Sequence, residues 1–105
     1  MKKLFISQPM KDKTDEQILA ERDAAINAAK EFLEEDVEVI DSFFKDEPEV
    51  KNIPLEFLAR SISLLAQADV AYFANGWEEA RGCRIEYECA VVYGIPAIGA
   101  IKDCG

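Results

Sequence analysis

The sequence predicts one α/β domain: a small open parallel sheet of about four strands, flanked by helices in a three-layer sandwich. Short apolar runs alternate along the chain with longer segments of helical periodicity, and turn-forming residues separate them. The chain has 105 residues, of which 50% are hydrophobic, enough for a single core. Alternating strands and helices favour parallel strands joined by right-handed crossovers. We therefore expect residues 1–105 to form one domain.

The chain begins with a predicted strand and a long predicted helix. Residues 3–7, KLFIS, form an apolar run that ends at a Gln-Pro loop. In the sequence TDEQ, Thr14 is expected to cap a helix and Gln17 to complete a capping box. Apolar residues recur at helical spacing from there on, which predicts a helix over residues 14–34.

The middle of the chain predicts a second strand, a loop and a second helix. Residues 37–44, VEVIDSFF, alternate in the manner of a strand with one partly polar face. Residues 45–54 are charged and contain two prolines, which predicts a surface loop. Pro54 suits the first turn of the helix that follows. Its predicted apolar face consists of Leu55, Leu58, Ile62 and Leu65.

The last third predicts a strand, a helix and a final strand. Residues 69–76, DVAYFANG, read as a strand and turn, residues 82–93 as a helix that stops at Gly94, and residues 95–101 as the fourth strand. This order is typical of a flavodoxin-like or Rossmann-like sheet. In such sheets, ligands bind beyond the carboxyl ends of the strands, where the strand order reverses. If the first strand is central, the loops 7–10 and 75–82 wall that crevice.

The composition excludes several classes of function. The formal net charge is −9, with 21 acidic and 12 basic residues, so a nucleic-acid polymer would be repelled. The chain has no histidine, and we expect neither a metal site nor a cofactor. Three cysteines without a CxxC pair, together with the lack of a signal-like or membrane-spanning segment, predict a cytoplasmic protein.

One glutamate stands within an apolar face of the helix predicted over residues 82–93. A step of about 100° per residue places seven residues on one arc: Ile85, Val92, Cys89, Gly82, Tyr93, Glu86 and Ala90. Arg84, Tyr87 and Val91 fall on the opposite side. A glutamate is almost never fully buried unless it is paired or functional.

Two interpretations of Glu86 remain open at this stage. In the structural one, an arginine such as Arg22, Arg60 or Arg81 neutralises the carboxylate, or the arc is an interface rather than a core. In the functional one, Glu86 is a nucleophile or general base in a water-poor cleft, and the small residues Gly82 and Ala90 leave room for a substrate.

The loops of the predicted crevice supply the candidate substrate-binding residues. These are Ser7, Gln8, Pro9 and Met10 in the first loop, and Gly76, Trp77, Arg81 and Gly82 in the second. Trp77 could hold a flat ligand or anchor its loop, and Arg81 could receive a phosphate or carry plain surface charge. Cys83 is expected to be a packed cysteine rather than a nucleophile, because the chain has no histidine to activate it.

These residues resemble the nucleoside 2-deoxyribosyltransferases and the related 2'-deoxynucleoside 5'-monophosphate N-hydrolases. In that superfamily a strand beginning Ala-Asp precedes the motif Gly-x-x-x-Glu-x-x-x-Ala, which Gly82, Glu86 and Ala90 match here. YGIPAI resembles the family's Gly-x-Pro approach to the next strand. The start FISQPM and the pattern GW...ARGC.IE resemble a small branch of the superfamily whose function is unassigned.

The resemblance implies an enzyme of nucleotide metabolism, a transferase or hydrolase. Glu86 would be the catalytic nucleophile that attacks the anomeric carbon of a 2-deoxynucleoside or its 5'-monophosphate. Ser61 and Ala80 occupy positions where the family's enzymes carry acidic residues. We expect Ser61 to contact the substrate. The alternative is therefore a non-catalytic module that binds a nucleotide or a protein in the same crevice. We expect a small nucleoside or nucleotide ligand, no nucleic-acid or membrane partner, and a homo-oligomer, dimeric or larger.

Overall fold

The computed structural model describes residues 1–9, 13–40 and 49–100. Their main feature is a four-stranded sheet in the order β2-β1-β3-β4, in which all neighbouring strands are parallel. The strands are β1 (Lys2–Ser7), β2 (Val37–Val39), β3 (Val70–Phe73) and β4 (Ala97–Gly99). The helices are α1 (Asp15–Leu33), α2 (Ile53–Leu65) and α3 (Arg81–Val92), with a 3₁₀ turn, η1 (Trp77–Glu79), before α3.

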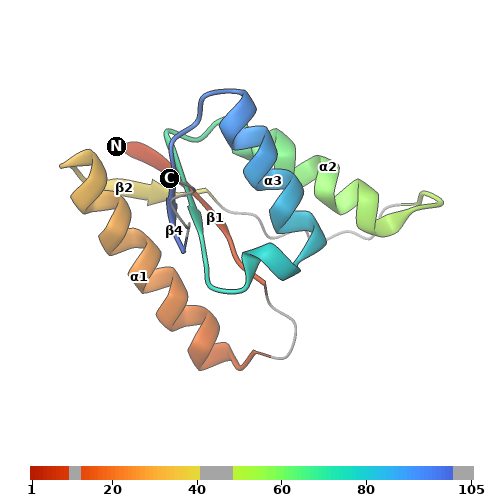
Figure 1. The fold of residues 1–105 in the computed structure, drawn as a ribbon, viewed down its shortest axis with the longest axis horizontal. Coiled ribbons are helices and arrows are strands. Elements are labelled where there is room, and N and C mark those ends of the chain that lie inside the picture. The colour runs from red at the N-terminus through yellow and green to blue at the C-terminus, as the bar shows by residue number, and fades with distance from the viewer. Residues whose placement is uncertain (10–12, 41–48, 101–105) are drawn as a thin grey trace.

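The predicted fold class is confirmed. The central strand β1 pairs with β2 on one side and β3 on the other, so the strand order reverses between β1 and β3. Right-handed crossovers then place α1 on one face of the sheet and α2 and α3 on the opposite face. Figure 1 shows this three-layer arrangement, with α2 and α3 side by side.

Local signals in the sequence explain where the helices begin. The Thr14 side chain accepts a hydrogen bond from the backbone N–H of Gln17, and the Gln17 side chain accepts one from Thr14, which confirms the capping box. The side chain of Asn52 caps α2, and Pro54 lies in the first turn of that helix. Both central strands occur as predicted, but β2 and β4 are shorter than expected. Residues 41–48 and 101, where the sequence also predicts strand or loop, lie outside the described residues.

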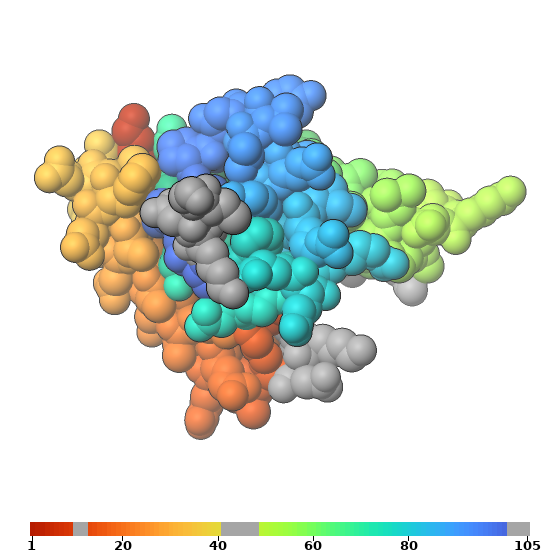
Figure 2. All heavy atoms as spheres, in the orientation of Figure 1, coloured from red at the N-terminus to blue at the C-terminus, as the bar shows by residue number. Residues whose placement is uncertain are grey.

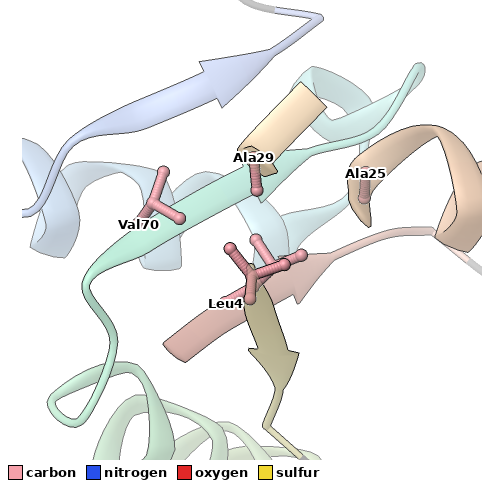
Figure 3. Packing of buried hydrophobic residues seen from close by; sticks show 5 residues of the cluster. Leu4, Ala25, Ala29 and Val70 are labelled. Atoms are coloured by element: carbon pink, nitrogen blue, oxygen red, sulfur yellow. The ribbon is translucent and has the colours of Figure 1, made fainter. Parts of the chain in front are cut away.

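The two faces of the sheet bury different residues because side chains alternate along a strand. Leu4 and Val70 face α1 and pack with Ala25, Ala29 and Val37 in one apolar cluster (Figure 3). The residues that follow them in the strands face α2 and α3, in a second cluster formed by Phe5, Leu65, Ala71, Phe73 and Ala90. By the same alternation, Ser7 lies on the face that α2 and α3 cover.

The buried side of α3 differs from the arc predicted by the helical wheel. Its buried residues are Cys83, Glu86 and Ala90, and Tyr87, predicted to point away, packs against the second cluster. Ile85, Val92 and Tyr93, predicted to lie on the buried arc, are exposed. The helix is thus rotated by roughly a quarter turn from the prediction, although Glu86 stays on the buried side. α3 lies at the surface of the molecule beside α2 (Figure 2), so apolar residues on its other sides remain uncovered.

None of the helices in the described part of the chain is long and apolar enough to cross a membrane.

Candidate functional site

The candidate site lies at the carboxyl ends of β1 and β3. Ser7 ends β1 opposite Phe73, the last residue of β3, and the backbone carbonyl of Ser7 accepts a hydrogen bond of 3.0 Å from Ala74. This is the point where the strand order reverses, at which parallel sheets bind ligands. α3 leaves the β3 side of this edge after η1 and packs across the sheet face that carries Ser7.

Glu86 is the buried carboxylate at this edge. Glu86 is 7% exposed and Ser7 is 2% exposed. Oε1 of Glu86 accepts a hydrogen bond of 2.8 Å from the Ser7 hydroxyl. Among the described residues, no arginine or lysine forms an ion pair with Glu86. Of the interpretations left open by the sequence, the one in which Arg22, Arg60 or Arg81 neutralises Glu86 is therefore wrong within the part of the chain that the structure describes.

The environment of Glu86 changes its proton affinity. Burial raises the pKa of the Glu86 carboxyl from 4.5 to about 7, and the hydrogen bond from Ser7 opposes part of this rise. A carboxyl group with a pKa near 7 exists in both its ionised and its protonated form around neutral pH. A carboxylate in this range can act as a nucleophile or a general base near neutral pH.

Glu86 lies in the wall of a cavity of about 350 Å³ between the sheet edge, α2 and the first turns of α3. This volume is within the usual range for small-molecule sites. The wall combines apolar side chains from β1 and α2 with polar groups that include Ser7, Ser61 and Glu86. The lining residues are Phe5, Ile6, Ser7, Gln8, Pro54, Phe57, Leu58, Ser61, Gly82, Cys83 and Glu86.

The structure brings together half of the ten residues that the sequence proposes for the site. Ser7, Gln8, Ser61, Gly82 and Glu86 all line the same cavity. They come from β1 and the loop after it, from α2 and from α3, and residues 7 and 86 are far apart in the sequence. The agreement is thus a property of the fold and not of sequence proximity.

The other proposed residues lie elsewhere. Pro9 and Gly76 are neighbours at the loop edge, where a Cβ atom added to Gly76 would lie 3.7 Å from Pro9 Cγ. Arg81 lines an adjoining groove with Leu55, Leu58 and Ile85 rather than the cavity. Met10 lies outside the described residues.

Trp77 is held in a cluster of aromatic rings. Its ring stacks on Tyr87 with centroids 4.5 Å apart, and Phe73 lies 5.6 Å from it. Its indole N–H donates a hydrogen bond of 2.7 Å to the backbone carbonyl of Ala100. These contacts fit the loop anchor, the second of the two roles that the sequence left open.

Gln8 lines the cavity, but its side-chain amide is directed toward α1. The amide donates to the backbone carbonyl of Ile18 at 3.3 Å and to the carboxylate of Glu21 at 3.2 Å. Lys13 pairs with the same Glu21 and donates to the backbone carbonyl of Asn75. This network joins the β1–α1 segment to the loop after β3, so that α1 braces both loops of the site.

Comparison with known proteins assigns no relative. No protein-family model, no curated protein and no solved structure matches the chain.

Sequence reasoning missed the apolar wall that α2 supplies. Phe57 and Leu58 follow Pro54 on the face of α2 that turns toward α3, and Ser61 comes one turn later. The helical spacing of these residues was visible in the sequence, but the pairing of α2 with α3 was not.

Cys83 also lines the cavity. Burial raises the pKa of its thiol, and the Ser7 hydroxyl opposes part of that rise, so the thiol stays protonated and is a poor nucleophile.

The described residues contain no group of three potential metal ligands. A second hollow, of about 440 Å³, lies between the C-terminal parts of α2 and α3 and is lined by Ile62, Leu65, Ala66, Cys89, Tyr93 and Ile95. It is larger than the cavity at Glu86, but it has no carboxylate, amide or cation in its wall. The cavity at Glu86 is therefore the better candidate for chemistry.

Proposed function

We propose that the protein is a deoxyribosyltransferase-like enzyme that cleaves or transfers the N-glycosidic bond of a 2-deoxynucleoside or its 5'-monophosphate. The observation that carries this proposal is the buried carboxylate of Glu86, which has no ion-pair partner among the described residues and lies in the wall of a cavity at the switch point of the sheet. The resemblance of the Gly82–Glu86–Ala90 motif to that superfamily supplies the reaction class.

The proposed reaction proceeds through a covalent intermediate. A Glu86 carboxylate oxygen attacks the anomeric carbon, the carbon–nitrogen bond breaks, and the base leaves with the bonding electron pair. The product is a deoxyribosyl ester of Glu86. Water then releases the free sugar, or a second base attacks and forms a new nucleoside. The departing base takes its proton from solvent, because Ser61 is not an acid near neutral pH.

The apolar wall supports this chemistry. The transition state of glycosidic cleavage carries positive charge on the sugar ring. A carboxylate that is removed from water stabilises that charge more strongly than a hydrated one does. Phe5, Phe57 and Leu58 line the cavity, and Glu86 itself is only 7% exposed, so little water reaches the carboxylate.

Chromatography of reaction mixtures tests the proposal. The purified chain is incubated with a panel of 2'-deoxynucleosides and their 5'-monophosphates, with and without a second base. Glu86→Ala removes the nucleophile, and Glu88→Gln is the matched control, because Glu88 lies on the same helix but is exposed. We expect base release or exchange in the wild type and in Glu88→Gln, and none in Glu86→Ala.

The same experiment separates the two reaction types. Product that forms only with an added base identifies a transferase, and free deoxyribose or its phosphate identifies a hydrolase. If no substrate in the panel turns over while all three proteins are equally folded, the enzyme proposal is wrong.

The second candidate function is a non-catalytic module that binds a nucleotide-like ligand or a partner protein. It is favoured by Ser61, which lines the cavity where the resembling enzymes would place an acid. The module would show ligand-dependent NMR shifts at Ser7, Ser61 and Gly82 with no product on long incubation. Shifts together with product would favour the enzyme.

We further propose that the chain acts as a cytoplasmic homo-oligomer. The support for the homo-oligomer is the apolar surface that α2 and α3 expose. It includes Leu55, Ile85, Val92 and Tyr93. Sedimentation equilibrium measures the assembly. A dimer or larger species that dissociates in Ile85→Glu agrees with this proposal, and a monomer at all concentrations contradicts it.

A further inference from the structure

We infer that Ser7 is a positioning residue for Glu86: its hydroxyl holds Oε1, so that Oε2 is the oxygen directed at the substrate. This role rests on the proposed function, because it assigns a reacting oxygen to the nucleophile. It differs from the expectation that Ser7 binds substrate, since the Ser7 hydroxyl is engaged with the enzyme's own carboxylate.

The geometry distinguishes the two oxygens of Glu86. Oε1 lies 2.8 Å from the Ser7 hydroxyl, and both side chains are buried. Within the described residues, Glu86 forms no other side-chain hydrogen bond, and no buried side-chain oxygen or nitrogen lacks a partner. Oε2 is therefore the oxygen that keeps contact with the open space of the cavity.

The backbone fixes the Ser7 hydroxyl in place. Ser7 ends a strand that pairs on its β3 side, where Ser7 lies in register with Phe73. Ser7 is two residues after Phe5 on β1, so both side chains lie on the sheet face that α3 covers. A short side chain on a paired strand loses little entropy when it holds one position, so Ser7 can fix the carboxylate of the longer Glu86 side chain.

The neighbours of Glu86 leave Ser7 as its principal polar contact in the described structure. On α3 the nearest titratable group is the buried thiol of Cys83, and Tyr87 is turned toward Trp77. α2 presents Ser61 and apolar side chains to the cavity. On the β1–α1 side, Lys13 is paired with Glu21. A hydrogen bond donated to a carboxylate stabilises its ionised form, so Ser7 also favours the form of Glu86 that attacks.

Two variants of Ser7 test this role. Ser7→Ala removes the donor and little volume, and Ser7→Thr keeps the hydroxyl. NMR titration of the Glu86 carboxyl carbon, assigned by its loss in Glu86→Gln, gives the pKa without any need for turnover. In Ser7→Ala we expect the pKa to rise by about one unit from its value in the wild type, and in Ser7→Thr to stay close to the wild-type value.

Kinetics on the substrate found in the panel provide the second readout. In Ser7→Ala, kcat at pH 7 should fall about tenfold with little change in KM, because the hydroxyl acts on the carboxylate and not on the substrate. The rising limb of the pH–rate profile should move upward with the pKa, and Ser7→Thr should restore both.

The outcomes separate this role from the proposed function. A Glu86 pKa that stays the same or falls in folded Ser7→Ala overturns the role, because Ser7 would then not stabilise the carboxylate. A KM increase at unchanged kcat also overturns it, in favour of direct substrate binding. If no variant, including the wild type, turns over any substrate, the enzyme proposal fails, and the pKa titration alone still decides whether Ser7 controls Glu86.

Discussion

The two faces of the sheet are built from the same strands but serve different purposes. On the α1 face, Leu4 and Val70 pack against Ala25 and Ala29, and all four are fully buried. On the α2/α3 face, β1 contributes Phe5 and then Ser7. The Ser7–Glu86 hydrogen bond and a cavity of about 350 Å³ lie between this face and the two helices. The buried residues of the α1 cluster are all apolar, whereas the α2/α3 face also holds a carboxylate and a cavity.

The difference shows where this chain gives up packing. A charged group and a cavity are each costly within a core of this size. Both occur on the α2/α3 face, at the carboxyl edge, although Ala71 and Phe73 on that face are as deeply buried as Leu4 and Val70 on the α1 face. Substitution of Leu4 or Val70 can therefore perturb the core without replacing a residue that lines the cavity.

The largest expected effect comes from two leucine substitutions, one on each face of the sheet. Leu4→Ala opens a hole in the α1 face and should lower the free energy of unfolding by about 2–5 kcal/mol. Leu58→Ala enlarges a cavity that already exists beside a half-buried side chain, and we expect less than half that loss. Urea denaturation measures both. Equal losses for the two variants would show that Leu58 is packed as tightly as Leu4.

The next effect is the pH dependence of stability, tested with Glu86→Gln. The folded state binds the Glu86 proton more tightly than the unfolded chain does, because burial raises the pKa from 4.5 to about 7. The tighter proton binding by Glu86 adds to the free energy of unfolding. This contribution is complete below pH 4.5 and is lost as the pH rises through about 7. Between these limits, the free energy of unfolding of the wild type should fall by about 3 kcal/mol relative to that of Glu86→Gln.

Urea denaturation from pH 4 to pH 8 checks this expectation. The wild-type and Glu86→Gln curves should diverge as the pH rises, with the variant the more stable at pH 8. Parallel curves would mean that the Glu86 carboxyl has an ordinary pKa, and that the α2/α3 face is wetter than its geometry indicates.

The smallest expected effect on stability comes from Gly82→Ala, at the edge of the cavity. The added Cβ would lie 3.9 Å from Leu58 Cδ1, an ordinary contact, and alanine is the better helix former. Thermal unfolding should therefore show no loss and at most about 1 kcal/mol of gain. The new methyl group narrows the cavity between α2 and α3, so turnover in the proposed reaction should fall even though stability does not. Unchanged turnover would place the ligand away from Gly82.

Much of the fold was predictable because its signals are local. The capping box at Thr14, Pro54 at the start of α2 and the turn at Gly76 mark boundaries that the sequence alone reveals. The placement of Glu86 on the buried side of α3 was also predicted, as was the convergence of Ser7 and Gly82 on it.

The rest depends on packing between elements. The helical wheel placed Ile85, Val92 and Tyr93 on the arc predicted to be buried, but these side chains are exposed on the outer sides of α3. Their hydrophobicity does not reveal which side meets the sheet. The contribution of Phe57 to the cavity was hidden for the same reason, since nothing in the sequence pairs α2 with α3.

The contacts of Trp77 give the protein an optical probe of its own site. Trp77 is the chain's single tryptophan, and it stacks on Tyr87, the residue that follows Glu86 on α3. Because ultraviolet light near the red edge of protein absorption excites tryptophan alone, the emission comes from one known ring. A shift of α3 would change the stacking and the exposure of that ring. Its fluorescence can thus follow events beside the carboxylate without any label.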